Sequence, residues 1–167
     1  MTAIQNIVEQ LQLQPHPEGG FYRETYRSDG VIPRDALPDP FEGSRNYATA
    51  IYFLLTSDSF SAFHRIRQDE VWHYYDGDPI SLHILKKEGG YEHHLLGRGF
   101  SAGQLPQLVV RAGDWFASEV LAPGTYSLAG CTVAPGFDFA DFELALRKDL
   151  IELYPDNRAL ITRMTRS

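Results

Sequence analysis

Residues 61–77 read Ser-Ala-Phe-His-Arg-Ile-Arg-Gln-Asp-Glu-Val-Trp-His-Tyr-Tyr-Asp-Gly and form the densest polar cluster of the sequence. Side chains alternate between the two faces of a strand, so one strand presents His64, and a second strand presents Glu70 together with Trp72 and Tyr74. If the strands are neighbours, His64 and Glu70 point into one cavity. A histidine titrates near neutrality and a carboxylate can orient or share its proton, so the pair suits acid–base chemistry. A hydrogen-bonded core histidine and a glutamate paired with an arginine would give the same pattern.

Further strand-sized segments lie on both sides of this stretch, separated by turn residues and with no helices between them. They cover residues 21–27, 47–55, 61–66, 70–75, 80–86, 91–96, 107–110, 115–120, 126–133 and 137–144. Such a series predicts an all-β sandwich or barrel. Apolar residues at helical spacing predict a short N-terminal helix, and residues 146–164 predict one or two C-terminal helices broken at Pro155, with Asp156 as an N-cap. We expect one domain over residues 1–167.

Composition excludes several classes of partner. The chain has a net charge of −7 and no run of Lys or Arg, which argues against nucleic-acid binding. The longest apolar stretch, residues 50–55, is too short to cross a membrane, and the N-terminus lacks the features of a signal peptide. Cys131 is the single cysteine, as suits a reducing compartment. We therefore expect a soluble, cytoplasmic protein with a small-molecule ligand.

Residues 61–77 resemble the first cupin motif, in which His-x-His is followed by a Glu and, six residues later, a Gly. His64, Glu70 and Gly77 match that motif in register. Residues 111–116 are similar to a remnant of the second cupin motif, of which Gly113 is kept. More specifically, residues 16–27, 61–77 and 126–142 resemble an uncharacterised cupin family, domain of unknown function 985, described as predicted sugar epimerases.

The resemblance implies a cupin double-stranded β-helix, or jelly-roll barrel, with a short N-terminal helix and C-terminal helices. Its interior would hold a small polar, sugar-like molecule. Cupins of this type commonly pair their barrels, which implies a homodimer. Residues 21–27 and the long loop over residues 28–46 would contribute to that interface, or the loop would serve as a lid.

The departures from the general cupin pattern concern the metal. A metal cupin typically holds its ion with three His and one Glu, but Ile66 and Phe116 stand where two of those histidines belong. His64 and Glu70 alone are too few ligands for a transition metal. We therefore expect no metal and no other cofactor.

By resemblance, the first hypothesis is a metal-independent sugar epimerase or isomerase. His64 would remove the proton next to a carbonyl, Glu70 or an aspartate would orient it, and Tyr126 would return a proton from the other face. Candidate substrate-binding residues are Arg23, Arg65, Trp72, Tyr74, Phe116 and Asp138. Two alternatives are a binding module without chemistry and, disfavoured by Ile66 and Phe116, a metal-dependent oxygenase or isomerase. The string from Pro17 to Gly20 is interpreted as a tight turn without a function of its own.

Overall fold

The computed structural model describes residues 2–166. In chain order its elements are α1 (Ala3–Gln10), β1 (Gln14–Pro15), β2 (Phe21–Arg27), β3 (Val31–Ile32), η1 (Arg34–Ala36), β4 (Arg45–Asn46), β5 (Thr49–Thr56), β6 (Phe60–Arg65), β7 (Asp69–Gly77), β8 (Ile80–Leu85), β9 (Tyr91–Leu96), η2 (Phe100–Ala102), β10 (Gln107–Val110), β11 (Trp115–Val120), β12 (Tyr126–Ala134), η3 (Phe139–Asp141), β13 (Glu143–Leu144), α2 (Arg147–Leu153), η4 (Pro155–Asn157) and α3 (Arg158–Arg163). Here η marks a short 3₁₀ helix.

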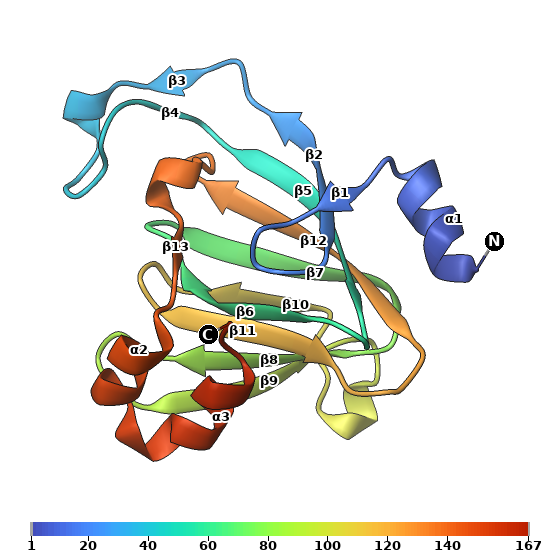
Figure 1. Cartoon of the computed structure of the whole chain (residues 1–167). Helices are drawn as coiled ribbons and strands as arrows, with labels where there is room; N and C mark the ends of the chain where they lie inside the picture. The colour runs from blue at the N-terminus through green and yellow to red at the C-terminus, as the bar shows by residue number, and fades with distance from the viewer. Residues whose placement is uncertain (1, 167) are drawn as a thin grey trace.

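Two antiparallel sheets face each other and form the barrel (Figure 1). One sheet has six strands in the order β1-β2-β5-β12-β7-β10, and the other has five in the order β13-β6-β11-β8-β9. Strands distant in sequence lie side by side, as where β12 runs between β5 and β7. The predicted all-β jelly roll is confirmed.

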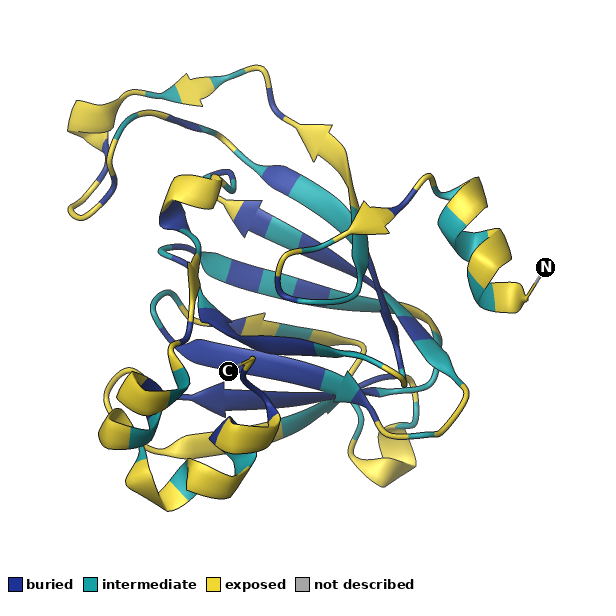
Figure 2. Cartoon of the chain, viewed as in Figure 1, coloured by how far each residue is buried: buried dark blue, intermediate teal, exposed yellow. Residues whose placement is uncertain are grey.

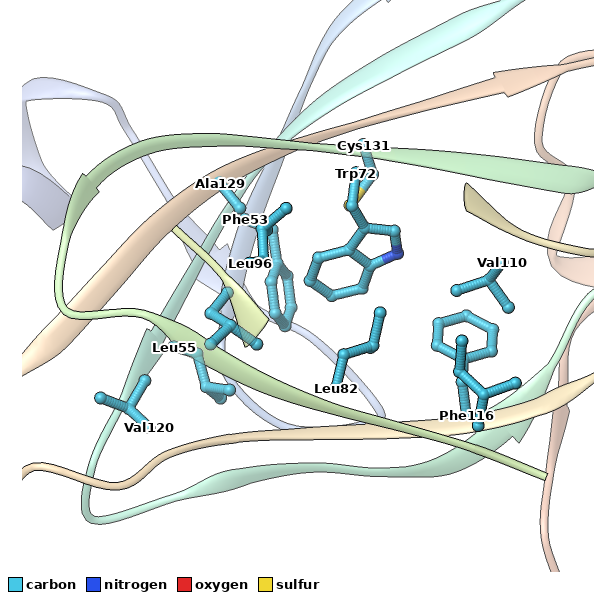
Figure 3. Packing of buried hydrophobic residues seen from close by; sticks show 12 residues of the cluster. Phe53, Leu55, Trp72, Leu82, Leu96, Val110, Phe116, Val120, Ala129 and Cys131 are labelled. Carbon is cyan, nitrogen blue, oxygen red and sulfur yellow. The ribbon is translucent and has the colours of Figure 1, made fainter. Parts of the chain in front are cut away.

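The main core fills the space between the sheets. Its buried members come from both sheets and include Phe53, Trp72, Leu82 and Phe116 (Figure 3). The ring centroids of Phe53 and Trp72 are 5.6 Å apart in an edge-to-face arrangement, which favours tight aromatic packing. The alternation seen in the sequence places these side chains inward because every second residue of a strand faces the same way.

A second cluster covers the outer face of the five-stranded sheet. Phe63 and Trp115 point outward from β6 and β11 and pack with Leu150 of α2 and Ile161 of α3. This is why β6, β8 and β11 are buried on both faces while the solvent sides of the two helices are exposed (Figure 2). None of the helices within residues 2–166 is long and apolar enough to cross a membrane.

The segment between β2 and β5 extends away from the barrel as an arm that contains β3, η1 and β4 (Figure 1). Strand β3 pairs with β4, and Arg45 ties the arm to the barrel through two 2.7 Å hydrogen bonds to the buried Asp141. The long loop predicted for residues 28–46 therefore has structure of its own.

Two local predictions were wrong. Residues 137–144 form the turn η3 and only the two-residue strand β13, because the Asp138 side chain accepts a hydrogen bond from the Ala140 N–H and starts a turn. Asp156 does not cap the last helix: it lies inside η4, and α3 begins after Asn157 without a side-chain cap. The helix at the N-terminus formed as predicted, with a capping box between Thr2 and Gln5.

Candidate functional site

A cavity of about 460 Å³ opens between the two sheets at the end where β6 stops and β7 begins. This volume lies within the range of small-molecule sites. The residues that line it are Gln14, His16, Glu18, Tyr22, Glu24, Arg27, Thr49, Ile51, Phe53, His64, Ile66, Glu70, Trp72, Cys131, Val133, Phe137, Asp138, Phe139 and Phe142. Aromatic and aliphatic walls thus surround a few titratable groups.

The turn between β1 and β2 delivers Glu18 into this cavity. The Ala62 N–H donates a 2.9 Å hydrogen bond to the Glu18 carbonyl, which fastens the turn to β6. Gly19 follows with a φ of +115°, and a Cβ atom there would lie 2.0 Å from the Phe60 carbonyl oxygen. Only glycine can make that approach, so the turn packs closely on β6 and its carboxylate faces His64.

His64 is held at both ring nitrogens. Its Nδ1 lies 2.7 Å from the Ala62 carbonyl oxygen, and its Nε2 lies 2.7 Å from Oε2 of Glu18. Because a carbonyl oxygen only accepts, Nδ1 carries a hydrogen. The proton between Nε2 and Oε2 then decides whether the pair is charged. Phe116 packs against the ring with its centroid 4.0 Å away.

Electrostatics favour the charged pair. Burial lowers the pKa of His64, but the charge of Glu18 and its hydrogen bond outweigh burial and raise it overall. For Glu18, burial raises the pKa, and attraction to His64 more than reverses this effect. An imidazolium and a carboxylate therefore face each other, both almost completely buried.

The pKa of Glu70 is shifted upward, in the opposite direction to that of Glu18. Burial raises its pKa from 4.5 to about 7, the attraction of His64 opposes this, and the charge of Glu18 adds to it. Near neutral pH, Glu70 therefore exchanges readily between acid and carboxylate, whereas Glu18 stays ionised. Two carboxyl groups whose environments separate their pKa values are a recurrent sign of acid–base assignment in enzymes.

His16 stays neutral on the other side of Glu18. Its Nδ1 accepts a 3.2 Å hydrogen bond from the Glu18 N–H, and burial lowers its pKa against the opposing charge of Glu18. Its ring contacts Tyr22 edge to face with the centroids 4.6 Å apart. His16 is therefore placed as a wall residue and as a fixed support for the turn.

The structure brings four of the sequence-derived candidates to the cavity wall: His64, Glu70, Trp72 and Asp138. Phe116 lies directly behind His64 and contacts it without lining the cavity. His64 and Glu70 both line this cavity, although β6 and β7 lie in different sheets and are not the paired neighbours that the expectation had supposed.

The other four candidates lie elsewhere. Tyr126 donates a hydrogen bond to Asp76 and lies seven positions before the wall residue Val133 on β12, roughly 23 Å away at the usual rise per residue. The hydroxyl of Tyr74 is bonded to the carbonyl of Gly77, at the same remote end.

Arg23 and Arg65 also point away from the cavity. Arg23 donates to the Leu11 carbonyl at 3.2 Å. Arg65 stacks on the outer face of Trp115 and pairs with Glu143 at 2.8 Å, because alternation along β6 turns it opposite to His64. None of the four is placed to touch a molecule in the cavity.

Sequence reasoning missed Glu18, the nearest partner of His64. The turn that carries it has ordinary turn composition, and its contact with β6 is tertiary. The available signal was the pair Gly19–Gly20, both with positive φ, which marks a backbone under close approach.

The residues present do not fit the metal centre of other cupins. Ile66 and Phe116 occupy two ligand positions, and Nε2 of His64 is already taken by Glu18. Across residues 2–166, no three His, Cys, Asp or Glu side chains are grouped so that they could hold a metal ion.

Solved structures show the same fold. A hypothetical protein from Leishmania major is 38% identical, with full coverage of both chains and a TM-score of 0.89. A protein from Shewanella oneidensis is 36% identical over 99% of both chains, with a TM-score of 0.86. An oxalate decarboxylase structure, 13% identical with a TM-score of 0.54 over 36% of its chain, shares the fold alone.

Sequence comparison gives the same family. An uncharacterised protein of Saccharomyces cerevisiae is 29% identical over 149 residues, which cover 84% of this chain and 74% of that protein. Residues 5–145 match the model of the family described as Cupin superfamily (DUF985). The match spans all strands of the barrel, the turn with Glu18 and every residue that lines the cavity, and the chain therefore belongs to this family of cupins.

Proposed function

We propose that the protein is a metal-independent epimerase or isomerase that moves a proton next to the carbonyl of a small, sugar-like molecule. One observation carries this proposal: two kinds of acid–base group line the same cavity. They are the ion pair of His64 with Glu18, and the carboxyl group of Glu70, whose pKa is about 7.

The two acid–base groups come from opposite sheets. Glu70 lies on β7 of the six-stranded sheet, and His64 lies on β6 of the five-stranded sheet. A molecule bound between the sheets would meet one group on each face. Inversion at a carbon needs this arrangement, because one group removes a proton and the other returns one from the opposite side.

The protonation states assign the roles. The Glu70 carboxylate takes the proton from the carbon next to the carbonyl, since its pKa near 7 matches the working pH of a general base.

The second proton comes from the ion pair. The Nε2–H of His64 donates to Oε2 of Glu18, so the imidazolium passes this proton to the Glu18 carboxylate, which gives it to the other face of the molecule. His64 becomes neutral, with its Nδ1–H still bonded to the Ala62 carbonyl. Until that transfer, Glu18 keeps His64 charged and oriented. This reverses the role expected for His64 from the sequence and replaces Tyr126, which is remote.

Deuterium exchange tests the proposal. The protein is incubated in D₂O with a panel of small hydroxy-carbonyl sugars, and proton NMR follows loss of the C–H signal next to the carbonyl. We expect exchange by the unmodified protein and a loss of at least about 100-fold in Glu70→Gln and His64→Asn. Glu143→Gln, an exposed carboxyl outside the cavity, is the matched control and should exchange normally.

Binding without exchange would refute the proposal. In that case the same cavity would be that of a metabolite-binding module, the second hypothesis drawn from the sequence.

A further inference from the structure

The charges around the cavity restrict its ligand. Four carboxyl groups face it, those of Glu18, Glu24, Glu70 and Asp138, and Arg27 is the one Lys or Arg among the described lining residues. An anionic group such as a phosphate would need free cationic or N–H donors to replace its water.

Arg27 is already engaged. Its Nε and one terminal nitrogen donate to Glu24 at 2.9 and 2.8 Å, and that same terminal nitrogen donates to the Phe137 carbonyl at 3.0 Å. The other terminal nitrogen donates to the Asn46 side chain at 2.8 Å. Four of the five guanidinium N–H groups therefore have partners, and the charge is balanced by Glu24.

A groove next to the cavity contains the cations Arg65, Arg67 and Lys87. Ile66 and Phe142 form part of the wall of both the groove and the cavity, so a phosphate on a ligand in the cavity could extend toward these cations. The groove also carries the acids Asp39, Asp141 and Glu143. Arg65 is paired with Glu143, and Arg67 donates to the Pro40 carbonyl. The groove therefore offers no concentrated positive charge to a phosphate attached to a molecule in the cavity.

Trp72 is a buried aromatic part of the cavity wall. Its side chain lines the cavity and is 1% exposed, and its indole Nε1–H has no hydrogen-bond partner among the described residues. Figure 3 shows this nitrogen turned away from Phe53, toward the side where Val110 and Phe116 lie. Neither Val110 nor Phe116 lines the cavity, so the nitrogen points into the core beside it, and the ring of Trp72 is the part that forms the cavity wall.

The aromatic walls suit a molecule with an apolar face and a few carbonyl or hydroxyl oxygens. We propose that the cavity selects an uncharged hydroxy-carbonyl compound, without phosphate or nucleotide groups, whose apolar face packs on the ring of Trp72. This inference rests on the proposed function, because it names the substrate class for the same cavity.

Matched pairs of sugars test the charge selection. The probes are glucose, fructose and dihydroxyacetone, each beside its phosphate ester, with UDP-glucose as the nucleotide form. Trp72 fluorescence reports binding in a Trp115→Phe background, since the chain has two tryptophans and Trp115 lies on the outer face. We expect at least one neutral member to bind and its phosphate ester to bind at least tenfold more weakly. Tighter binding of any phosphorylated member, or no binding of any neutral one, overturns the inference.

The outcomes separate this inference from the proposed reaction. Selection against phosphate without deuterium exchange would leave the ligand class standing and remove the reaction. Exchange with a preference for phosphorylated sugars would do the reverse.

Discussion

Replacement of Glu70 by glutamine should stabilise the protein at alkaline pH and leave its stability unchanged in acid. The pKa of Glu70 rises from 4.5 in the unfolded chain to about 7 in the fold, with burial as the main cause. Below pH 4.5 the carboxyl is protonated in both states, and folding carries no ionisation penalty. As the pH rises toward 7 the unfolded state loses this proton first, so the stability of the native protein falls.

The size of the effect follows from the two pKa values. One pKa unit corresponds to about 1.4 kcal/mol, so the difference lowers the free energy of unfolding by about 3 kcal/mol above pH 7. Glutamine has nearly the same shape and does not titrate. The variant should therefore melt roughly 6–12 °C above the unmodified protein at pH 8, and at the same temperature at pH 4.

Urea unfolding of both proteins between pH 4 and pH 9 measures this difference directly. His64 and Glu18 titrate in both proteins and are coupled to Glu70, so the difference between the curves measures the ionisation of Glu70 together with its effect on that pair. Glu143→Gln, at an exposed carboxyl, should follow the unmodified protein throughout. A stability difference that does not change with pH would mean that Glu70 titrates normally, and its assignment as the general base would fail.

Three further predictions concern the ion pair, metal and assembly. His64→Ala should cost about 3–5 kcal/mol at pH 7 in urea unfolding because it leaves Glu18 charged and buried, and adding Glu18→Gln should restore part of it; no recovery would contradict the ion pair. Elemental analysis should find less than one metal per chain, with unchanged melting in chelator, whereas one tightly held equivalent would reverse this view. We also propose a homodimer formed through β2 and the arm, which sedimentation at micromolar concentration would contradict by showing a monomer.

The barrel was predictable because its signals are local. Alternation of inward and outward side chains decides each strand, and the turn residues separate them. The prediction failed over residues 137–144 for an equally physical reason. Asp138 turns the backbone through its own side chain, and Asp141 is committed to Arg45, an interaction between distant segments that no local pattern displays.

Site residues could be predicted from the sequence only where they lie on strands. Strand parity placed His64 and Glu70 on inward faces, and it also separated His64 from Arg65. Parity does not say how far along a strand a residue lies from the cavity, which is why Tyr74 and Tyr126 were mistaken for wall residues. Glu18 comes from a turn, where there is no periodicity to read.

The turn with Glu18 explains how one cavity can hold two differently charged carboxyl groups. The charge of Glu18 raises the pKa of Glu70, and the imidazolium of His64 lowers the pKa of both carboxyl groups to different extents. Glu18, at 2.7 Å from Nε2, receives most of this stabilisation and ionises fully. Glu70 receives less and keeps its proton up to neutral pH. Without this turn, Glu70 would be the one carboxylate near the His64 imidazolium, and its pKa would fall. A Glu70 carboxyl with a lower pKa would be too weak a base for the proposed reaction near neutral pH.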